Sequence, residues 1–266
     1  MLIAFWSTHH GQTATTTNLL SIALCAALKY KLKVLVGHAQ PGITQMERAL
    51  LSEDRLTGHA SQTNENTGNA LIRLARNKML QSSTISNYTI PLLKESRLDV
   101  LNGYSLNLKQ EDLQDVEVLK QILSTATDAY DIVFLDLHSG LEKDYTRALL
   151  EHADTVVVNL SQNKMVLDAF IEKKSSIKFK CEPILCIGRY QKSSRLTEKA
   201  IKKQMSTPCL VKVPQHTSLI DLMNEGNVLE FFGRHYYRER FEKKHPFFED
   251  VAKSTHTLLK QLELVK

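Results

Sequence analysis

The stretch that decides the fold is Leu2–Leu28, which reads LIAFWSTHHGQTATTTNLLSIALCAAL. It begins with a short apolar run, Leu2–Trp6, that predicts a buried strand. Residues 7–17 form a polar, hydroxyl-rich loop, and Asn18–Leu28 has the apolar density of a buried helix. A strand, a tight loop and a helix in this order are typical of a phosphate-binding loop in an α/β fold. Such a loop normally carries a lysine, but the first lysine in this chain is Lys29.

Short apolar runs recur along the rest of the chain and predict further strands. They are Lys33–Val36, Tyr88–Leu93, Leu98–Leu101, Tyr130–Asp136, Thr155–Leu160, Pro183–Ile187 and Cys209–Val213. Segments with helical patterning lie between them. These are Thr44–Leu51, Ala70–Leu80, Leu113–Ala126, Tyr145–His152, Val166–Lys174 and Leu196–Met205. The alternation predicts an α/β fold with a single doubly wound, mostly parallel sheet flanked by helices.

This pattern accounts for residues 1–266 as one domain, with 216–266 as a C-terminal helical extension packed on it. Ligands bind such sheets outside the carboxyl ends of the strands. The loops expected there are residues 7–17, 37–42, 136–140, 188–192 and 214–217.

The composition narrows the class of protein. The chain has 266 residues, 42% of them hydrophobic, which is enough for a sizeable core, and its net charge of +5 does not argue for nucleic acid or anionic lipid. The first apolar run is too short for a signal peptide, and no run approaches the roughly 18 residues of a membrane span. We therefore expect a cytoplasmic protein without stable membrane insertion. The four cysteines lack C-x-x-C spacing and lie in or beside apolar runs, which predicts buried free thiols.

Several segments follow one another in the order of a known family. His10–Thr17 reads HGQTATTT, His38–Gly42 reads HAQPG and Asp136–Gly140 reads DLHSG, and Gly188-Arg189 and Val213–Gln215 come after them. In these segments the chain resembles the ParA/MinD family of P-loop ATPases, which carry a deviant Walker A loop. It looks most similar to the TadZ/CpaE-type proteins of Flp/Tad pilus assembly. The resemblance covers most of the chain.

The resemblance implies a nucleotide site at the loop ends. Its nucleotide-binding positions would be Gly11, Gln12, Thr13, Ala14, Thr15, Thr16, Thr17, Arg189 and Pro214. Its magnesium-side positions would be Thr16 and Asp136. The alternative for Gly11–Thr17 is a purely structural turn inherited from the fold, and the alternative for Asp136 is a helix N-cap.

Charged groups are missing from this site. The family pattern in the loop is K-G-G-x-G-K-[ST]-[ST], so His10 and Thr15 stand where lysines are expected and Ala14 replaces a glycine. His38 and Gln40 stand where the second motif has carboxylates. Without such charges, stabilisation of a transferring phosphoryl group is largely lost. The resemblance therefore implies an inefficient ATPase that binds ATP or ADP with Mg²⁺ weakly, or no nucleotide at all.

Three functions fit these residues. The first is a localisation or assembly scaffold for Flp/Tad pilus or secretion machinery, acting through protein–protein contacts as a homodimer or with assembly proteins. Such a scaffold is either free in the cytoplasm or recruited to the inner face of the membrane. The second is an active, ATP-cycling ParA-type ATPase for plasmid or chromosome partitioning. The third is a DNA-binding regulator that uses the basic and aromatic residues of 233–244.

Other features each have a simpler interpretation. His9, His10 and His38 either share a metal site or are solvated histidines. Residues 233–244 form either a DNA-binding segment or a solvated helix with its aromatic residues packed inward. Phe247–Leu262 has an apolar face that meets either a membrane or the domain itself, and its polar face is not strongly basic, which favours packing on the domain.

Overall fold

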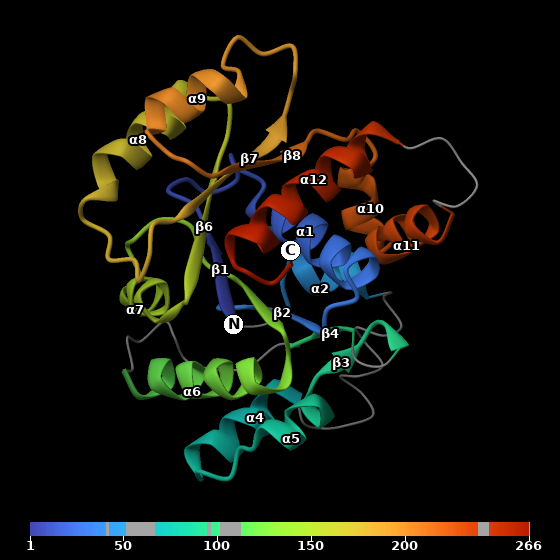
Figure 1. The fold of residues 1–266 in the computed structure, drawn as a ribbon. Coiled ribbons are helices and arrows are strands. Elements are labelled where there is room, and N and C mark those ends of the chain that lie inside the picture. Colours follow the sequence, from blue (N-terminus) through green and yellow to red (C-terminus); the bar gives the residue numbers. More distant parts are fainter. Residues whose placement is uncertain (41–42, 52–66, 95–96, 102–112, 239–244, 266) are drawn as a thin grey trace.

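An eight-stranded sheet runs through the molecule in the order β3-β4-β2-β5-β1-β6-β7-β8 (Figure 1). The computed structural model describes residues 1–40, 43–51, 67–94, 97–101, 113–238 and 245–265. The strands are β1 (Leu2–Trp6), β2 (Val34–His38), β3 (Ile90–Pro91), β4 (Leu98–Val100), β5 (Ile132–Asp136), β6 (Thr155–Leu160), β7 (Ile184–Tyr190) and β8 (Leu210–Pro214). All described pairings are parallel except that of β3 with β4. The predicted α/β fold with a mostly parallel sheet is confirmed.

Strand β1 contributes to two cores, one on each face of the sheet. Leu2, Ala4 and Trp6 belong to one core, and Ile3 and Phe5 belong to the other. This alternation follows from the two-residue period of a strand. Because helices cover both faces, every residue of β1 is buried, so the sequence shows a continuous apolar run rather than an alternating one.

Two layers of helices enclose the sheet (Figure 1). The layer that packs on Ile3 and Phe5 contains α1 (Thr15–Lys29), α2 (Gln45–Leu50), α10 (Leu219–Glu225), α11 (Val228–Arg238) and α12 (Pro246–Gln261). The opposite layer contains α4 (Thr67–Arg76), α5 (Ser82–Ile85), the 3₁₀ helix η1 (Ser86–Tyr88), α6 (Leu113–Ala129), α7 (Asp144–His152), α8 (Lys164–Lys174) and α9 (Glu198–Met205).

Helix α12 covers the edge strand β8. Ser254 Oγ accepts a hydrogen bond from the Lys212 N–H at 3.1 Å and donates to the Lys212 carbonyl at 2.7 Å. These bonds occupy polar groups that an uncovered edge strand would present to another chain. The apolar face of α12, with Phe248, Val251 and Leu258, is buried against β8 and α1. Among the helices that the structure describes, none combines the length and apolarity needed to cross a membrane.

The described part of the segment 233–244 continues α11 as far as Arg238. Its aromatic side chain Tyr236 packs toward the protein, with ring centroids 6.4 Å from Phe232 and 5.8 Å from Phe248. Inward packing of the aromatics is therefore confirmed for Tyr236. Residues 239–244, which carry much of the basic charge of this segment, lie outside the described residues.

Several elements differ from the sequence prediction at their ends, and two of these differences bear on the candidate site. Helix α1 begins at Thr15 rather than Asn18, so the last three residues of the predicted loop form the first helical turn. Strand β7 continues to Tyr190 instead of ending at Ile187, because a bulge carries the chain past its regular pairing with β8. Both differences lie at the edge where the candidate site forms.

The prediction of buried free thiols is wrong for one cysteine. Cys25, Cys186 and Cys209 are buried and free, but Cys181 is exposed. Cys181 lies in the polar connection between α8 and β7, where its Sγ approaches the carbonyl of Asp154 at 3.4 Å. The sequence reasoning placed it with the strand that follows, which begins only at Ile184.

Candidate functional site

The loop between β1 and α1 contains two left-handed residues. Gly11 has a φ of 73°, and Ala14, the N-cap of α1, has a φ of 55°. No described side chain caps α1, and its first turn holds no acidic residue. The N–H groups of Thr15–Thr17 therefore lack the side-chain partner that often satisfies a helix N-terminus. Together with the helix dipole, they form a donor-rich end that suits an anion.

Two fully buried asparagines fasten this loop to the sheet. Asn18 Nδ2 donates to the carbonyl of Thr13 and to Asn159 Oδ1, both at 2.9 Å. Asn159 Nδ2 donates to the carbonyl of Trp6, at the end of β1, at 3.2 Å. Sequence reasoning missed this anchor. The available signal was an asparagine inside an apolar helix and another inside an apolar strand, since buried polar groups need partners.

Strand β7 approaches the loop so closely that its residue 188 has no room for a side chain. A Cβ on Gly188 would lie 2.2 Å from the Thr13 carbonyl oxygen and 2.6 Å from Asn18 Nδ2. Arg189 follows with a φ of 50°, at the bulge of β7. This backbone places Arg189 in the same cavity wall as Ala14.

Asp136 ends β5 and meets the first turn of α1. Thr16 Oγ1 donates a hydrogen bond to Asp136 Oδ2 at 2.5 Å. Burial raises the pKa of Asp136 to about 6, although the hydrogen bond from Thr16 opposes this shift. A helix N-cap role for Asp136 is wrong, because α7 begins at Asp144 with Lys143 as its N-cap.

The oxygen atoms of Thr16 and Asp136 fit a magnesium ion. Hydroxyl and carboxylate oxygens are hard ligands, and Mg²⁺ typically takes one or two of them from the protein and the rest from water and phosphate. These two residues would hold the ion, which would supply positive charge to a bound phosphate. The same oxygens bind each other at 2.5 Å, so the protein keeps them paired by its own hydrogen bond.

Beside Asp136, the end of β2 carries a buried histidine–glutamate pair. His38 pairs with Asp136 in the register of β2 and β5. The Gln40 N–H donates to His38 Nδ1 at 3.2 Å, so Nε2 carries the ring hydrogen and donates to Glu47 Oε1 at 2.5 Å. Glu47 Oε2 accepts from the N–H of Thr44 at 2.9 Å and from its hydroxyl at 2.6 Å. Burial opposes ionisation of Glu47, but these hydrogen bonds hold its pKa below the ordinary value.

Glu47 is a candidate residue that sequence reasoning missed. Its side chain is fully buried, although it lies on a short helix, α2. The spacing Thr44-x-x-Glu47 is that of a capping box, which the structure contains and which the sequence could have revealed. Glu47 therefore leaves one carboxylate on this side of the site, although His38 and Gln40 replace two.

The three histidines of the proposed metal site are directed to different partners. His38 bonds to Glu47, and His9 Nδ1 lies 2.9 Å from Thr8 Oγ1. The ring of His10 stacks on His138 with centroids 6.1 Å apart. Over the described part of the chain, no group of three histidines, cysteines or carboxylates is arranged to hold a metal ion. Solvation is also wrong for His38, which is 1% exposed.

Two adjoining cavities open at this edge of the sheet. The first, of about 260 Å³, is called the loop cavity and is lined by His10, Gly11, Thr13, Ala14, Thr15, Thr16, Thr17, Gln40, Gln45, Asp136, Leu137, Ser139, Arg189 and Met223. The second, of about 70 Å³, is called the Pro214 cavity and is lined by Ala14, Thr17, Asn18, Arg189, Val213, Pro214, Gln215, His216, Thr217, Leu219 and Ile220. All the predicted site residues line one cavity or the other except Gln12.

Solved structures share this architecture over nearly the whole chain. A ParA family ATPase from Chlorobium tepidum TLS matches with a TM-score of 0.71 at 14% identity, covering 97% of this chain and 98% of that one. The MinC:MinD cell division protein complex of Aquifex aeolicus matches with a TM-score of 0.67 at 15% identity, covering 97% and 96%. A putative plasmid partition protein from Borrelia burgdorferi B31, bound to AMPPNP, matches with a TM-score of 0.66 at 17% identity, covering 98% of each chain.

The chain has the ParA/MinD fold. At these identities the likeness is one of fold alone. No model of a protein family matches the sequence, and no curated protein matches it.

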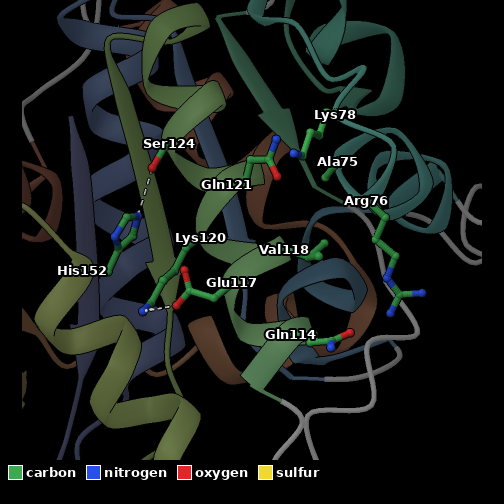
Figure 2. A pocket seen from close by; sticks show the side chains of 10 residues that line it. All are labelled: Ala75, Arg76, Lys78, Gln114, Glu117, Val118, Lys120, Gln121, Ser124 and His152. Atoms are coloured by element: carbon green, nitrogen blue, oxygen red, sulfur yellow. Dashed lines mark hydrogen bonds and ion pairs between the residues drawn. The ribbon is translucent and has the colours of Figure 1, made fainter.

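A larger cavity, of about 650 Å³, lies elsewhere on the ParA/MinD fold, between α4, α6 and α7 (Figure 2). Several of its polar side chains are paired with close neighbours. Lys120 Nζ donates to Glu117 Oε1 at 2.7 Å, and His152 Nε2 lies 3.1 Å from Ser124 Oγ (Figure 2). Burial lowers the pKa of His152, and the nearby lysines act in the same direction. None of the predicted site residues lines this cavity, so the loop ends of the sheet are the better candidate site.

Proposed function

We propose that this chain is a localisation or assembly scaffold whose nucleotide site binds ATP or ADP weakly and turns over little or no ATP. The observation that carries the proposal is the segment Gly11–Thr17. It keeps an uncapped helix N-terminus beside Asp136 but contains no lysine. A scaffold of the TadZ/CpaE type, serving Flp/Tad pilus or secretion machinery, fits a site that is retained in shape and depleted in charge.

Nucleotide binding is supported by the chemistry of the loop cavity. The N–H groups of Thr15–Thr17 can receive phosphate oxygens, and Thr16 and Asp136 can hold Mg²⁺. A protein of the same fold was solved with AMPPNP bound. Loss of one hydrogen bond to a charged group weakens binding by roughly 10- to 100-fold, so a loop without lysine retains binding of lower affinity.

Slow or absent hydrolysis follows from the groups around Asp136. His38 replaces an expected carboxylate, and Glu47 is already engaged by His38 and Thr44. Removing one group that stabilises developing charge typically lowers a rate by about 10²- to 10³-fold. Several such losses in one site leave turnover near the uncatalysed background.

Calorimetry with ADP and Mg²⁺ tests binding. The wild type should show weak, saturable binding. Ala14→Asp should lower ADP affinity at least about tenfold, because an aspartate at the N-cap occupies the same N–H groups, while raising the free energy of unfolding by about 1 kcal/mol. Ala14→Asn is the matched control, since it caps the helix without a charge and should retain more affinity. A wild type that binds neither ADP nor ATP would end the proposal.

Phosphate release tests turnover. Wild-type protein should release phosphate from ATP at the background rate. Thr15→Lys, which places a lysine in the loop cavity, should raise ADP affinity about tenfold or more. Gln12→Lys is the matched control, because Gln12 lines neither cavity. Robust wild-type hydrolysis that Thr16→Ala abolishes would overturn the proposal.

That opposite outcome would favour an active, ATP-cycling ParA-type ATPase for plasmid or chromosome partitioning. The retained contact between Thr16 and Asp136, and the likeness in fold to a plasmid partition protein, are the observations in its favour. The missing lysine weighs against it.

The scaffold would act as a homodimer or with assembly proteins, in the cytoplasm or at the inner face of the membrane. The MinC:MinD complex is an example of a protein of this fold bound to another protein. Sedimentation velocity with and without ADP should reveal a dimer whose population changes little with nucleotide. Retention on DNA that is strong at low salt and lost at high salt would instead favour the DNA-binding regulator.

A further inference from the structure

Arg189 lies in the wall that the two cavities of the candidate site share. It lines both the loop cavity and the Pro214 cavity, and it is the only lysine or arginine among the described residues that line either one. The carboxyl group in these walls is that of Asp136. Any positive charge that the folded chain brings to a ligand in these cavities therefore comes mainly from Arg189.

The backbone of β7 fixes the position from which the side chain of Arg189 extends. Gly188 packs against the Thr13 carbonyl, where a Cβ would lie at 2.2 Å, so the end of β7 is in direct contact with the loop. Arg189 then leaves the strand with a φ of 50°, a conformation that is unfavourable for a residue with a Cβ. Backbone strain of this kind persists where the surrounding structure holds it in place.

Two further features indicate that these walls are completed by a ligand. The side chain of Arg189 is exposed, and no described carboxylate forms an ion pair with it. Asn18, which is fully buried in the wall of the Pro214 cavity, has an Oδ1 atom with no hydrogen-bond partner among the described residues. Buried polar atoms are rarely left unpaired, so this oxygen marks a place for a donor from a ligand or from water.

We propose that Arg189 supplies, from the end of β7, the positive charge that the loop lacks, and that it binds the phosphate groups of a nucleotide seated on the N–H groups of Thr15–Thr17. This inference rests on the proposed nucleotide site and adds to it the residue that selects for phosphate. The family resemblance assigns this position to the adenine side instead. A guanidinium group offers two parallel N–H donors in a planar fork that matches two phosphate oxygens, whereas a lysine ammonium acts as a point charge.

Calorimetry with ADP and with adenosine separates the two roles. Arg189→Gln should weaken ADP binding about 10- to 100-fold while leaving adenosine binding unchanged. Arg189→Lys should recover part of the ADP affinity, because the charge returns without the planar fork. Arg195→Gln is the matched control, since Arg195 is exposed and lines neither cavity. Thermal melting of each variant establishes that it folds.

Each outcome decides the proposal. Unchanged ADP affinity in Arg189→Gln overturns it, and so does an equal loss for ADP and adenosine, which would place Arg189 on the base. The proposal is also overturned if the wild type binds ADP no more tightly than it binds adenosine. A wild type that binds neither compound removes the proposed nucleotide site itself, which distinguishes that failure from an error about Arg189 alone.

Discussion

The two cavities of the candidate site differ in how their polar groups are satisfied. Around the loop cavity, Thr16 bonds to Asp136 and His38 bonds to Glu47, so the protein pairs its own buried groups. At the Pro214 cavity, Asn18 Oδ1 and His216 Nδ1 are buried and have no hydrogen-bond partner among the described residues. The difference indicates that the side chains around the loop cavity are paired without a ligand, which leaves the backbone N–H groups of Thr15–Thr17 for one, whereas the Pro214 cavity also holds buried side-chain atoms that a ligand would satisfy.

The largest expected effect comes from the glycine at which β7 packs against the loop beside both cavities. Gly188→Ala places a Cβ 2.2 Å from the Thr13 carbonyl oxygen, so the loop or β7 must move. We expect a loss of about 3 kcal/mol in the free energy of unfolding, measured by urea denaturation. Gly37→Ala is the control, because its Cβ would meet only the Leu101 side chain at 3.3 Å. Equal effects of the two substitutions would contradict the close approach of β7 to the loop.

The next effect tests the hydrogen-bonded pairing of buried side chains beside the loop cavity. Glu47→Gln removes a buried carboxylate that accepts from His38 and Thr44. We expect a loss of about 2 kcal/mol at pH 7, because the donors keep weaker partners. Since the folded pKa of Glu47 is lowered, its stabilisation is present above its unfolded pKa and disappears as the pH falls through the folded one. The difference between wild type and variant should therefore shrink in acid.

The pairs Thr16–Asp136 and His38–Glu47 also show how far the sequence alone could predict the fold and the candidate site. Continuous apolar runs predicted β1 and β5, and their neighbouring carboxyl ends follow from a parallel sheet, so a meeting of Thr16 with Asp136 could be expected. The burial of Glu47 could not, because it depends on how α2 packs beneath the end of β2. The sequence motifs therefore show the loss of carboxylates at His38 and Gln40, but they do not show that Glu47 of α2 places a carboxylate beside His38.

The other misses also arise from tertiary contacts rather than from local pattern. The approach of Gly188 to Thr13 requires the bulge in β7, which no run of apolar residues reveals. The exposure of Cys181 depends on where β7 begins, and strand ends are the least predictable part of an element. Periodicity thus predicts which residues share a face, but the distances between separate elements come only with packing.

An effect of similar size but opposite sign tests the pairing of Thr16 with Asp136 at the loop cavity. Asp136→Asn should raise the free energy of unfolding by roughly 2 kcal/mol at pH 7, because burial opposes the ionised carboxylate. The pKa of Asp136 is about 6 in the folded protein, above its unfolded value, so wild-type stability should fall as the pH rises between the two.

The variant should lack that fall, which a series of urea denaturations between pH 4 and pH 7 would show. Mg²⁺ with ADP should stabilise the wild type but not Asp136→Asn. A variant less stable than wild type at pH 7 would mean that the contact with Thr16 outweighs the burial of charge.

The smallest effect is expected at the unpaired nitrogen of the Pro214 cavity. His216 packs between Phe231 and Phe247, with ring centroids at 5.2 Å and 4.9 Å. Because its Nδ1 has no described partner, His216→Phe should change the free energy of unfolding by no more than about 0.5 kcal/mol at pH 8 without ligand. Burial and the neighbouring His245 lower the pKa of His216, so wild-type stability should fall as the pH drops below its unfolded pKa, and the variant should lose that dependence. If His216→Phe were instead as costly as Glu47→Gln, the Pro214 cavity would be as self-contained as the loop cavity, and the contrast between them would disappear.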